Sequence, residues 1–165
     1  MDEQIQFRPP TSADARAMRS LAQDSQVLSV NSTYYYALMA RHFSDTCLVA
    51  EGTEGICGYV TGYSPPEQPD TLFVWQVGVA HECQGQGLAT KMLSALINSK
   101  QPDYLEATIA PDNKASINLF CSVARQLGAD YTFAKTPFFG EEELGAGEDA
   151  EHLMHIGPFI TATTK

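Results

Sequence analysis

Apolar residues recur along the chain at two spacings, one typical of strands and one typical of helices. The stretches with the strand pattern are residues 4–8, 46–51, 56–63, 71–80, 104–109, 130–139 and 152–156. The turn Gly52–Gly55 joins the second and third of these into a predicted hairpin. The run Thr71–Ala80 is almost continuously apolar, which is typical of a central strand. Gly78 within that run predicts a bulge or the close approach of another backbone or a ligand.

The helical spacing predicts helices that begin at a cap of Thr11 or Ser12, at Asn31-Ser32, at Gln86 and at a cap of Asp112 or Asn113. The apolar residues at this spacing are Ala13, Ala17 and Leu21; Tyr34, Leu38 and Phe43; Leu88, Met92 and Leu96 beside Ala89, Leu93 and Ile97; and Ile117, Phe120 and Ala124 beside Leu119, Val123 and Leu127. The prolines of Ser64–Asp70 indicate a loop, and we expect the acidic stretch Glu141–Asp149 to be a mobile loop.

The order of these elements is strand, two helices, three strands, helix, strand, helix and two strands. That order indicates a mixed α/β (α+β) domain around one sheet, rather than a strict βαβ alternation or a barrel.

The composition fits one domain over residues 1–165, because 44% of the 165 residues are apolar and 18% are charged. Ten Lys and Arg residues stand against 20 Asp and Glu residues, which gives a formal net charge of −10. This balance argues against a general nucleic-acid binder and against an anionic membrane surface as a partner. An acidic surface serves solubility, and it also attracts cations such as small amines.

The cysteines and the N-terminal residues bear on the compartment. Cys47, Cys57, Cys83 and Cys121 show no CxxC spacing, so we expect thiols in a reducing cytoplasm rather than a disulfide framework. The segment Met1–Ile5 has neither a basic nor an apolar stretch, so we expect no signal peptide. No apolar run approaches the length of a membrane span, and a cytoplasmic protein is therefore the prediction.

The strongest chemical signal is the segment Val77–Ala89. A strand ends there, a turn with Gly85 and Gly87 follows, and an amphipathic helix begins at once. Backbone N–H groups converge in such a turn and the helix N-terminus adds partial positive charge, so the turn is suited to bind phosphate. The Lys-Ser/Thr pair of a Walker loop and the GxGxxG spacing of a dinucleotide-binding turn are both absent from the sequence. On spacing alone, a turn that merely connects a strand to a helix explains the glycines equally well.

The run Gln84-Gly85-Gln86-Gly87-Leu88-Ala89 resembles the Q/R-x-x-G-x-G/A signature of the Gcn5-related N-acetyltransferase (GNAT) superfamily. The resemblance implies a central mixed, mostly antiparallel twisted sheet of about seven strands flanked by about four helices. It also implies acetyl-CoA as co-substrate, without a metal, with the pyrophosphate at this turn and the pantetheine arm on Trp75–Val79. Pro111–Phe120 resembles the N-x-x-A-x-x-L-Y block that closes over the cofactor. The residues so assigned to the cofactor are Val77, Gly78, Val79, Gln84, Gly85, Gln86, Gly87, Leu88, Ala89, Asn113, Ser116 and Phe120.

Other segments resemble the diaminobutyrate acetyltransferases of ectoine biosynthesis. They are Asp24-Ser25, Asn31–Tyr34, His42–Thr46, Thr71–Val77, Pro111–Asn113 and Ile156–Phe159. This resemblance implies acetyl transfer to the 4-amino group of L-2,4-diaminobutyrate, giving N4-acetyl-L-2,4-diaminobutyrate and CoA, and it suggests a homodimer. By position in the family motifs, the candidates for binding the amine substrate are Asp24, Asn31, Tyr34, Trp75 and Glu151.

Each of these candidates also has an ordinary structural explanation. Asp24 suits a turn or helix cap, and Asn31 or Ser32 suits the cap of the second helix. Trp75 suits the core of a central strand, and a solvated carboxylate is the usual state of a Glu such as Glu151. Tyr34, Tyr35 and Tyr36 cannot all point one way on a helix, and of the three we expect Tyr34 to face the cleft.

The chain departs from the two family patterns in three places. Phe120 stands where many of these acetyltransferases have the Tyr that protonates the leaving thiolate, Ser29 stands where the diaminobutyrate enzymes have Asp, and Glu148 stands where those enzymes have His. Another diamine, a polyamine or a peptide amine therefore stays open as the acceptor. A non-catalytic acyl-CoA-binding module also stays open.

Acetyl transfer to an amine requires a neutral amine, a polarised thioester carbonyl and an attack geometry that holds the two together. Backbone N–H groups near Val77 and Gly78 are the predicted site for the oxyanion. No cysteine lies beside a His in a motif, so we expect direct transfer without a covalent enzyme intermediate. The sequence does not identify the residue that accepts the amine proton.

Overall fold

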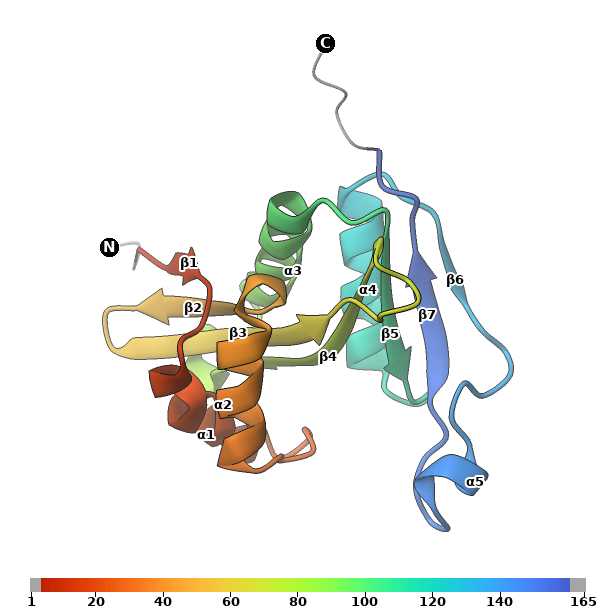
Figure 1. The fold of residues 1–165 in the computed structure, drawn as a ribbon, viewed down its shortest axis with the longest axis horizontal. Helices are drawn as coiled ribbons and strands as arrows, with labels where there is room; N and C mark the ends of the chain where they lie inside the picture. The colour runs from red at the N-terminus through yellow and green to blue at the C-terminus, as the bar shows by residue number, and fades with distance from the viewer. Residues whose placement is uncertain (1–3, 161–165) are drawn as a thin grey trace. The chain divides into compact units, whose positions relative to one another are not determined.

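A computed structural model describes residues 4–160 of the chain as a mixed α/β fold (Figure 1). Residues 1–3 and 161–165 of the predicted 1–165 domain lie outside the described residues. The strands are β1 Gln6–Arg8, β2 Leu48–Gly52, β3 Gly55–Tyr63, β4 Thr71–Val79, β5 Tyr104–Ile109, β6 Tyr131–Phe133 and β7 His152–Ile156. The α-helices are α1 Ala15–Ser25, α2 Thr33–His42, α3 Leu88–Lys100, α4 Lys114–Gln126 and α5 Glu141–Leu144.

Hydrogen bonds join the strands in the order β1-β2-β3-β4-β5-β7-β6. The β4–β5 pair is parallel, whereas the pairs β1–β2, β2–β3, β5–β7 and β6–β7 are antiparallel. The expected mixed, mostly antiparallel sheet of seven strands is therefore confirmed, as are the predicted hairpin and the internal place of β4.

The described chain divides into two compact units. Unit 1 comprises residues 4–64 and 74–100, and unit 2 comprises residues 65–73 and 101–160. The strand β4 contributes its first residues to unit 2 and the remainder to unit 1.

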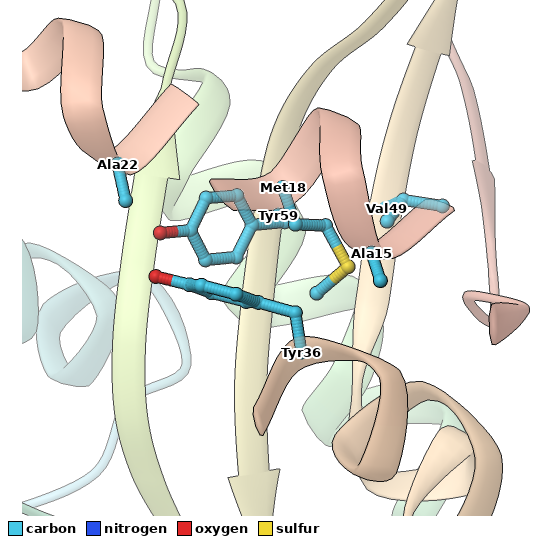
Figure 2. Packing of buried hydrophobic residues seen from close by; sticks show 6 residues of the cluster. All are labelled: Ala15, Met18, Ala22, Tyr36, Val49 and Tyr59. Carbon is cyan, nitrogen blue, oxygen red and sulfur yellow. The ribbon is translucent and has the colours of Figure 1, made fainter. Parts of the chain in front are cut away.

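The helices α1 and α2 pack on one face of the strands in unit 1 (Figure 2). The buried cluster there consists of Ala15, Met18, Ala22, Tyr36, Val49 and Tyr59. The predicted helical spacing of Ala13, Ala17 and Leu21 is displaced from the buried positions Ala15, Met18 and Ala22. α1 begins at Ala15, after a 3₁₀ turn, Ser12–Asp14, whose Asp14 carboxylate accepts hydrogen bonds from Arg8. The buried residues are those that face the cluster with Tyr36, Val49 and Tyr59.

The helix α3 packs on the opposite face of the same strands. A Cβ built on Gly58 would lie 3.0 Å from Sδ of Met92 in α3, whereas the neighbouring Tyr59 packs in the cluster of α1 and α2. Successive strand residues point to opposite faces, so the helices cover both sides of β3. The predicted apolar residues Leu88, Met92, Leu93, Leu96 and Ile97 are all buried, which confirms the amphipathic pattern of this helix.

In unit 2, β5 alternates between buried and half-buried residues, with Leu105, Ala107 and Ile109 buried. The predicted β5 bounds are confirmed, whereas the strand expected over residues 130–139 covers only Tyr131–Phe133. The stretch expected to be an acidic loop contains a short helix, α5, in which the backbone N–H of Gly140 donates to Oε2 of Glu143 at 2.8 Å. Among the described residues, no helix is both long and apolar enough to cross a membrane.

Candidate functional site

The glycine turn lies in unit 1, between the end of β4 and the start of α3. Gly85 and Gly87 have φ values of +75° and +72°, which L side chains rarely adopt, so both positions favour glycine. A Cβ on either glycine would meet no heavy atom of the described residues within 4 Å, so the surface of the turn is open. The conformation of the backbone, rather than lack of space, explains these two glycines.

The first turn of α3 presents backbone donors toward the glycine turn. The N–H of Lys91 donates to the carbonyl oxygen of Gly87 at 3.0 Å, which starts the helical hydrogen-bond pattern. The preceding N–H groups of Leu88 and Ala89 therefore have no carbonyl acceptor one turn earlier in the helix. Together with the helix dipole, such donors form a site for an anion that needs no basic side chain.

The side chains of Gln84 and Gln86 donate hydrogen bonds to backbone carbonyl oxygens four or five residues earlier in the chain. Gln84 Nε2 donates to the carbonyl oxygen of Val79 at 3.2 Å, and Gln86 Nε2 donates to that of Glu82 at 3.3 Å. These two bonds join the side chains of Gln84 and Gln86 to backbone carbonyl oxygens that precede the glycines.

The strand β4 continues beyond its pairing with β5. The register of the two strands runs from Thr71 to Phe73 on β4, and β4 extends to Val79. The sequence predicted a bulge or the close approach of a backbone or a ligand at Gly78, whereas the group that the structure places there is the side-chain ring of Tyr59.

Trp75 is half exposed, at 51%, so the alternative that it is a core residue does not hold. The ring of Tyr35 lies 4.5 Å from that of Trp75, and the Tyr35 hydroxyl is hydrogen-bonded to Thr61 Oγ1 at 3.0 Å. Burial raises the pKa of Tyr35 above its ordinary value, so the phenol stays neutral.

The three successive tyrosines of α2 differ in exposure. Tyr34 is 72% exposed, and Tyr36 is buried. Sequence reasoning chose Tyr34 and passed over Tyr35, because helical spacing alone does not say which of three successive tyrosines meets a strand.

The two other candidates of unit 1 lie at the ends of the segment between α1 and α2. Asp24 is an exposed residue in the last turn of α1, whose C-cap is Gln26. Ser32, rather than Asn31, caps α2, because its Oγ accepts from the N–H of Tyr35 at 3.2 Å. The carbonyl oxygen of Asn31 accepts from Arg19 Nε at 3.2 Å, which leaves the Asn31 side chain outside the cap.

In unit 2, Glu151 is held by its backbone beside Phe139. The Glu151 N–H donates to the Phe139 carbonyl oxygen at 2.9 Å, and the Glu151 carbonyl oxygen accepts from Phe138 N at 2.8 Å. Burial raises the pKa of the Glu151 carboxyl, and a hydrogen bond with Thr108 opposes that shift. Among the described residues, Oε2 of Glu151 is buried without a hydrogen-bond partner. A buried carboxylate oxygen in this state is suited to a cation.

The remaining candidates of unit 2 lie on α4. Asn113 is the N-cap, and its Oδ1 accepts from the N–H of Ser116 at 3.2 Å, which confirms the predicted cap. Phe120 is buried in the same helix, at 4% exposure. The structure thus groups Asn113, Ser116, Phe120 and Glu151 in unit 2, and it groups Trp75 and the glycine turn in unit 1.

Sequence reasoning also missed a hydrogen-bonded pair of side chains in unit 2. His155 Nδ1 lies 2.9 Å from Glu106 Oε1, and the two residues are register partners on β7 and β5. No local motif could have shown a pair that is 49 positions apart. Within residues 4–160, no group of three or more His, Cys, Asp or Glu side chains is arranged to hold a metal ion.

Comparison with known proteins places these features in a family. A model described as the acetyltransferase (GNAT) family matches residues 15–122. The L-2,4-diaminobutyric acid acetyltransferase of Halalkalibacterium halodurans is 39% identical over 163 residues, covering 96% of this chain and 84% of that protein. The protein of the same name from Marinococcus halophilus is 40% identical over 161 residues, covering 95% and 92%.

A solved structure is similar along the whole chain. It is the diaminobutyrate acetyltransferase of Paenibacillus lautus in complex with its substrate L-2,4-diaminobutyric acid and coenzyme A. The TM-score is 0.88 at 34% sequence identity, and the match covers 98% of this chain and 99% of that chain.

Proposed function

The chain belongs to the acetyltransferase (GNAT) family, and we propose that it transfers the acetyl group of acetyl-CoA to the 4-amino group of L-2,4-diaminobutyrate. The products are N4-acetyl-L-2,4-diaminobutyrate and CoA, a step in ectoine biosynthesis. The observation that carries the proposal is the similarity along almost the full chain to a diaminobutyrate acetyltransferase solved with that amine and coenzyme A. We further propose that residues 1–165 act as one catalytic domain.

The glycine turn is the proposed binding site for the pyrophosphate of acetyl-CoA. Its open surface, the positive φ of Gly85 and Gly87 and the N–H groups at the start of α3 fit an anionic group. The backbone of Val77–Val79, beyond the register with β5, is the proposed partner of the pantetheine arm. Asn113, Ser116 and Phe120 on α4 stay proposed cofactor-binding residues.

The amine substrate carries two ammonium groups and one carboxylate near neutral pH. Oε2 of Glu151 has no partner among the described residues, so it is the proposed acceptor for one ammonium group. The half-exposed ring of Trp75 offers a face for cation–π contact with an ammonium group. Asp24, Asn31 and Tyr34 stay proposed substrate-binding residues, and Tyr35 supports the ring of Trp75.

The proposed reaction is a direct transfer in a ternary complex. Alkyl ammonium groups have pKa values near about 10, so the amine must first lose a proton to a base or to water. The neutral nitrogen then attacks the thioester carbon, the carbon–sulfur bond breaks, and CoA leaves as a thiolate. The nitrogen loses a second proton as the amide forms, which balances the proton that the thiolate takes up. Backbone N–H groups near Val77 and Gly78 are the proposed stabilisers of the oxyanion. Phe120 has no proton to give, so it is not the acid in this step.

We also propose that the protein acts in the cytoplasm and that it assembles as a homodimer. Gel filtration with light scattering tests the assembly, because a homodimer has twice the 18.0 kDa mass of the chain.

A thiol-release assay with purified protein tests the function. We expect rapid CoA release with L-2,4-diaminobutyrate and slower release with putrescine, lysine and a peptide amine. Faster turnover with one of those amines would overturn the assigned acceptor. Tight acetyl-CoA binding without CoA release in the presence of any amine would instead favour the non-catalytic acyl-CoA-binding module that Phe120 leaves open.

A further inference from the structure

Gln76 is a buried amide in the middle of β4. Its exposure is 7%, and it lies between Trp75 and Val77, which the proposed function assigns to the amine and to the cofactor. Burying an amide is unfavourable unless its polar atoms find hydrogen-bond partners. The partners of Gln76 therefore indicate what the residue does.

Three groups, all in unit 1, bind the Gln76 amide. Its Oε1 accepts from the hydroxyl groups of Tyr36 at 2.8 Å and Tyr59 at 2.6 Å, and its Nε2 donates to the carbonyl oxygen of Ser29 at 2.8 Å. Figure 2 shows the hydroxyl groups of Tyr36 and Tyr59 next to each other and pointing the same way. A carbonyl oxygen can only accept, so the amide nitrogen must face Ser29 and the amide oxygen must face the tyrosines.

The bond to Ser29 ties a loop to a strand. Ser29 lies in residues 26–32, the α1–α2 loop. Two further hydrogen bonds join this loop to α1: Oγ of Ser25 accepts from Leu28 N at 3.1 Å, and Arg19 Nε donates to the Asn31 carbonyl oxygen at 3.2 Å. Both of those contacts fix the loop to the helix that precedes it. The Gln76 bond fixes it to β4, 47 positions further along the chain.

One apolar side chain of the loop, Leu28, is partly buried against the cluster of α1 and α2. Val27 and Val30 are exposed, at 88% and 43%, so little of their apolar surface holds the loop in place. The hydrogen bond from Gln76 to the Ser29 carbonyl oxygen therefore adds a directional contact between the loop and the strand that bears Trp75.

We propose that Gln76 is a positioning residue for the amine substrate, because its amide holds the α1–α2 loop, with Asn31, in place against the strand that bears Trp75. This inference rests on the proposed function. Gln76 need not touch the substrate itself, since both faces of its amide are engaged by protein groups. Its loss affects use of the amine and leaves the glycine turn intact.

The variant Gln76→Glu separates the bonds that the side chain accepts, from Tyr36 and Tyr59, from the bond that it donates, to Ser29. A carboxylate still accepts from both tyrosines, but it cannot donate to the Ser29 carbonyl and repels that oxygen. We expect the KM for L-2,4-diaminobutyrate to rise at least about tenfold, which corresponds to ~1.4 kcal/mol. The Kd for acetyl-CoA, measured by calorimetry, should stay within about twofold. Backbone amides of residues 26–32 should exchange hydrogen faster by mass spectrometry.

Tyr36→Phe is the matched control, because it removes one donor to Oε1 and leaves the bond to Ser29 in place. We expect its exchange in residues 26–32 and its KM for the amine to match the wild type. If Gln76→Glu does not fold, the triple variant Tyr36→Phe, Tyr59→Phe and Gln76→Met replaces the network with apolar groups of similar shape. The same rise in KM and faster exchange are expected for it.

Unchanged exchange in residues 26–32 of both Gln76 variants would overturn the loop attachment. Faster exchange with an unchanged KM would overturn the positioning role, as would equal loss of amine use in Tyr36→Phe. Failure of the proposed function itself has a different signature: the wild-type protein would release no CoA with diaminobutyrate, whatever the exchange of the loop.

Discussion

The ring of Tyr59 fills the space where a side chain at position 78 would lie. A Cβ built on Gly78 would approach Cζ of Tyr59 to 2.8 Å, in the strand proposed to bind the pantetheine arm. The same tyrosine donates its hydroxyl hydrogen to Gln76 at 2.6 Å, and burial raises its pKa, so the hydroxyl stays protonated. One core residue thus constrains β4 at two positions.

Gly78→Ala should therefore destabilise the protein. Overpacking a filled site costs about 1–3 kcal/mol, and the Tyr59 ring is held by its hydrogen bond and cannot move away freely. Urea unfolding gives the free energy. Gly52→Ala is the control, because a Cβ there would meet its nearest neighbour at an ordinary 3.9 Å, and it should cost less than about 0.5 kcal/mol. Equal stability of the two variants would contradict the role of Tyr59.

Gly87→Glu should weaken binding of acetyl-CoA at least about tenfold, or ~1.4 kcal/mol. The variant places a negative charge in the phosphate turn and strains a backbone with a φ of +72°. Gly128→Glu controls for the strain, since Gly128 has a φ of +64° beyond the end of α4 and no heavy atom of the described residues within 4 Å of its Cβ position. Calorimetric titration of both variants with acetyl-CoA gives the two Kd values. Similar weakening in the two would place the cofactor away from the turn.

Glu151→Gln should raise the KM for diaminobutyrate and leave the Kd for acetyl-CoA unchanged, because it removes the charge that is proposed to bind an ammonium group of the substrate. Glu148→Gln, at an exposed position in the same segment, is the control and should behave as wild type. Steady-state kinetics with each substrate varied in turn give both constants. An unchanged KM in Glu151→Gln would remove this residue from the amine site.

Glu151→Gln is also expected to change the stability of the fold in a way that depends on pH. The pKa of Glu151 is raised in the folded state, so the folded protein binds this proton more tightly than the unfolded chain does. The carboxylate therefore destabilises the fold at neutral pH, and this cost disappears as the pH falls below the unfolded pKa. We expect Glu151→Gln to be at least as stable as wild type at pH 7, with a smaller difference at pH 4. Thermal melts across this range measure it, and lower stability of the variant at pH 7 would contradict the burial argument.

Asp14→Asn should cost about 1–3 kcal/mol, because hydrogen bonds to charged groups contribute about that much. Arg8 Nη1 and Nη2 lie 2.8 and 3.0 Å from the Asp14 carboxylate, and these bonds lower its pKa. The pair stabilises the fold above the unfolded pKa of Asp14, and the effect is lost as the pH falls through the lower folded pKa. Asp45→Asn is the control, since that carboxylate is 73% exposed in its pair with Lys100. Urea unfolding at pH 7 and at low pH gives the free energy of unfolding of the wild type and of both variants.

The elements that local patterns define were predictable from the sequence. The apolar face of α3 from Leu88 to Ile97 follows a helical period without interruption. Every apolar residue predicted on this face is buried except Ala89, and the helix begins at Leu88 rather than at the predicted Gln86. The bounds of β5 also follow from an alternating run. By contrast, the buried face of α1 is determined by its packing against Tyr36, Val49 and Tyr59, which are far from it in the chain, and no local periodicity contains that information.

The site was predictable where one continuous segment forms it. The turn between β4 and α3 needs nothing beyond neighbours in the sequence, so its place was predictable, whereas the positive φ values of Gly85 and Gly87 were not predicted. Its role in binding the cofactor stays a prediction. The contact of Tyr35 with Trp75 and the link of Gln76 to Ser29 join segments that are far apart in the chain. Such contacts depend on strand register and helix rotation, which local patterns do not define.

The bond between Gln76 and Ser29 has a consequence for the order of folding. The donor follows its acceptor by 47 residues, so the α1–α2 loop is made early in synthesis and receives its hydrogen bond only after β4 has emerged and paired. The N-terminal segment can collapse on its own apolar residues before then, but the geometry proposed to recognise the amine forms late. Nascent chains that end before residue 76 would therefore contain α1 and α2 without an ordered substrate loop.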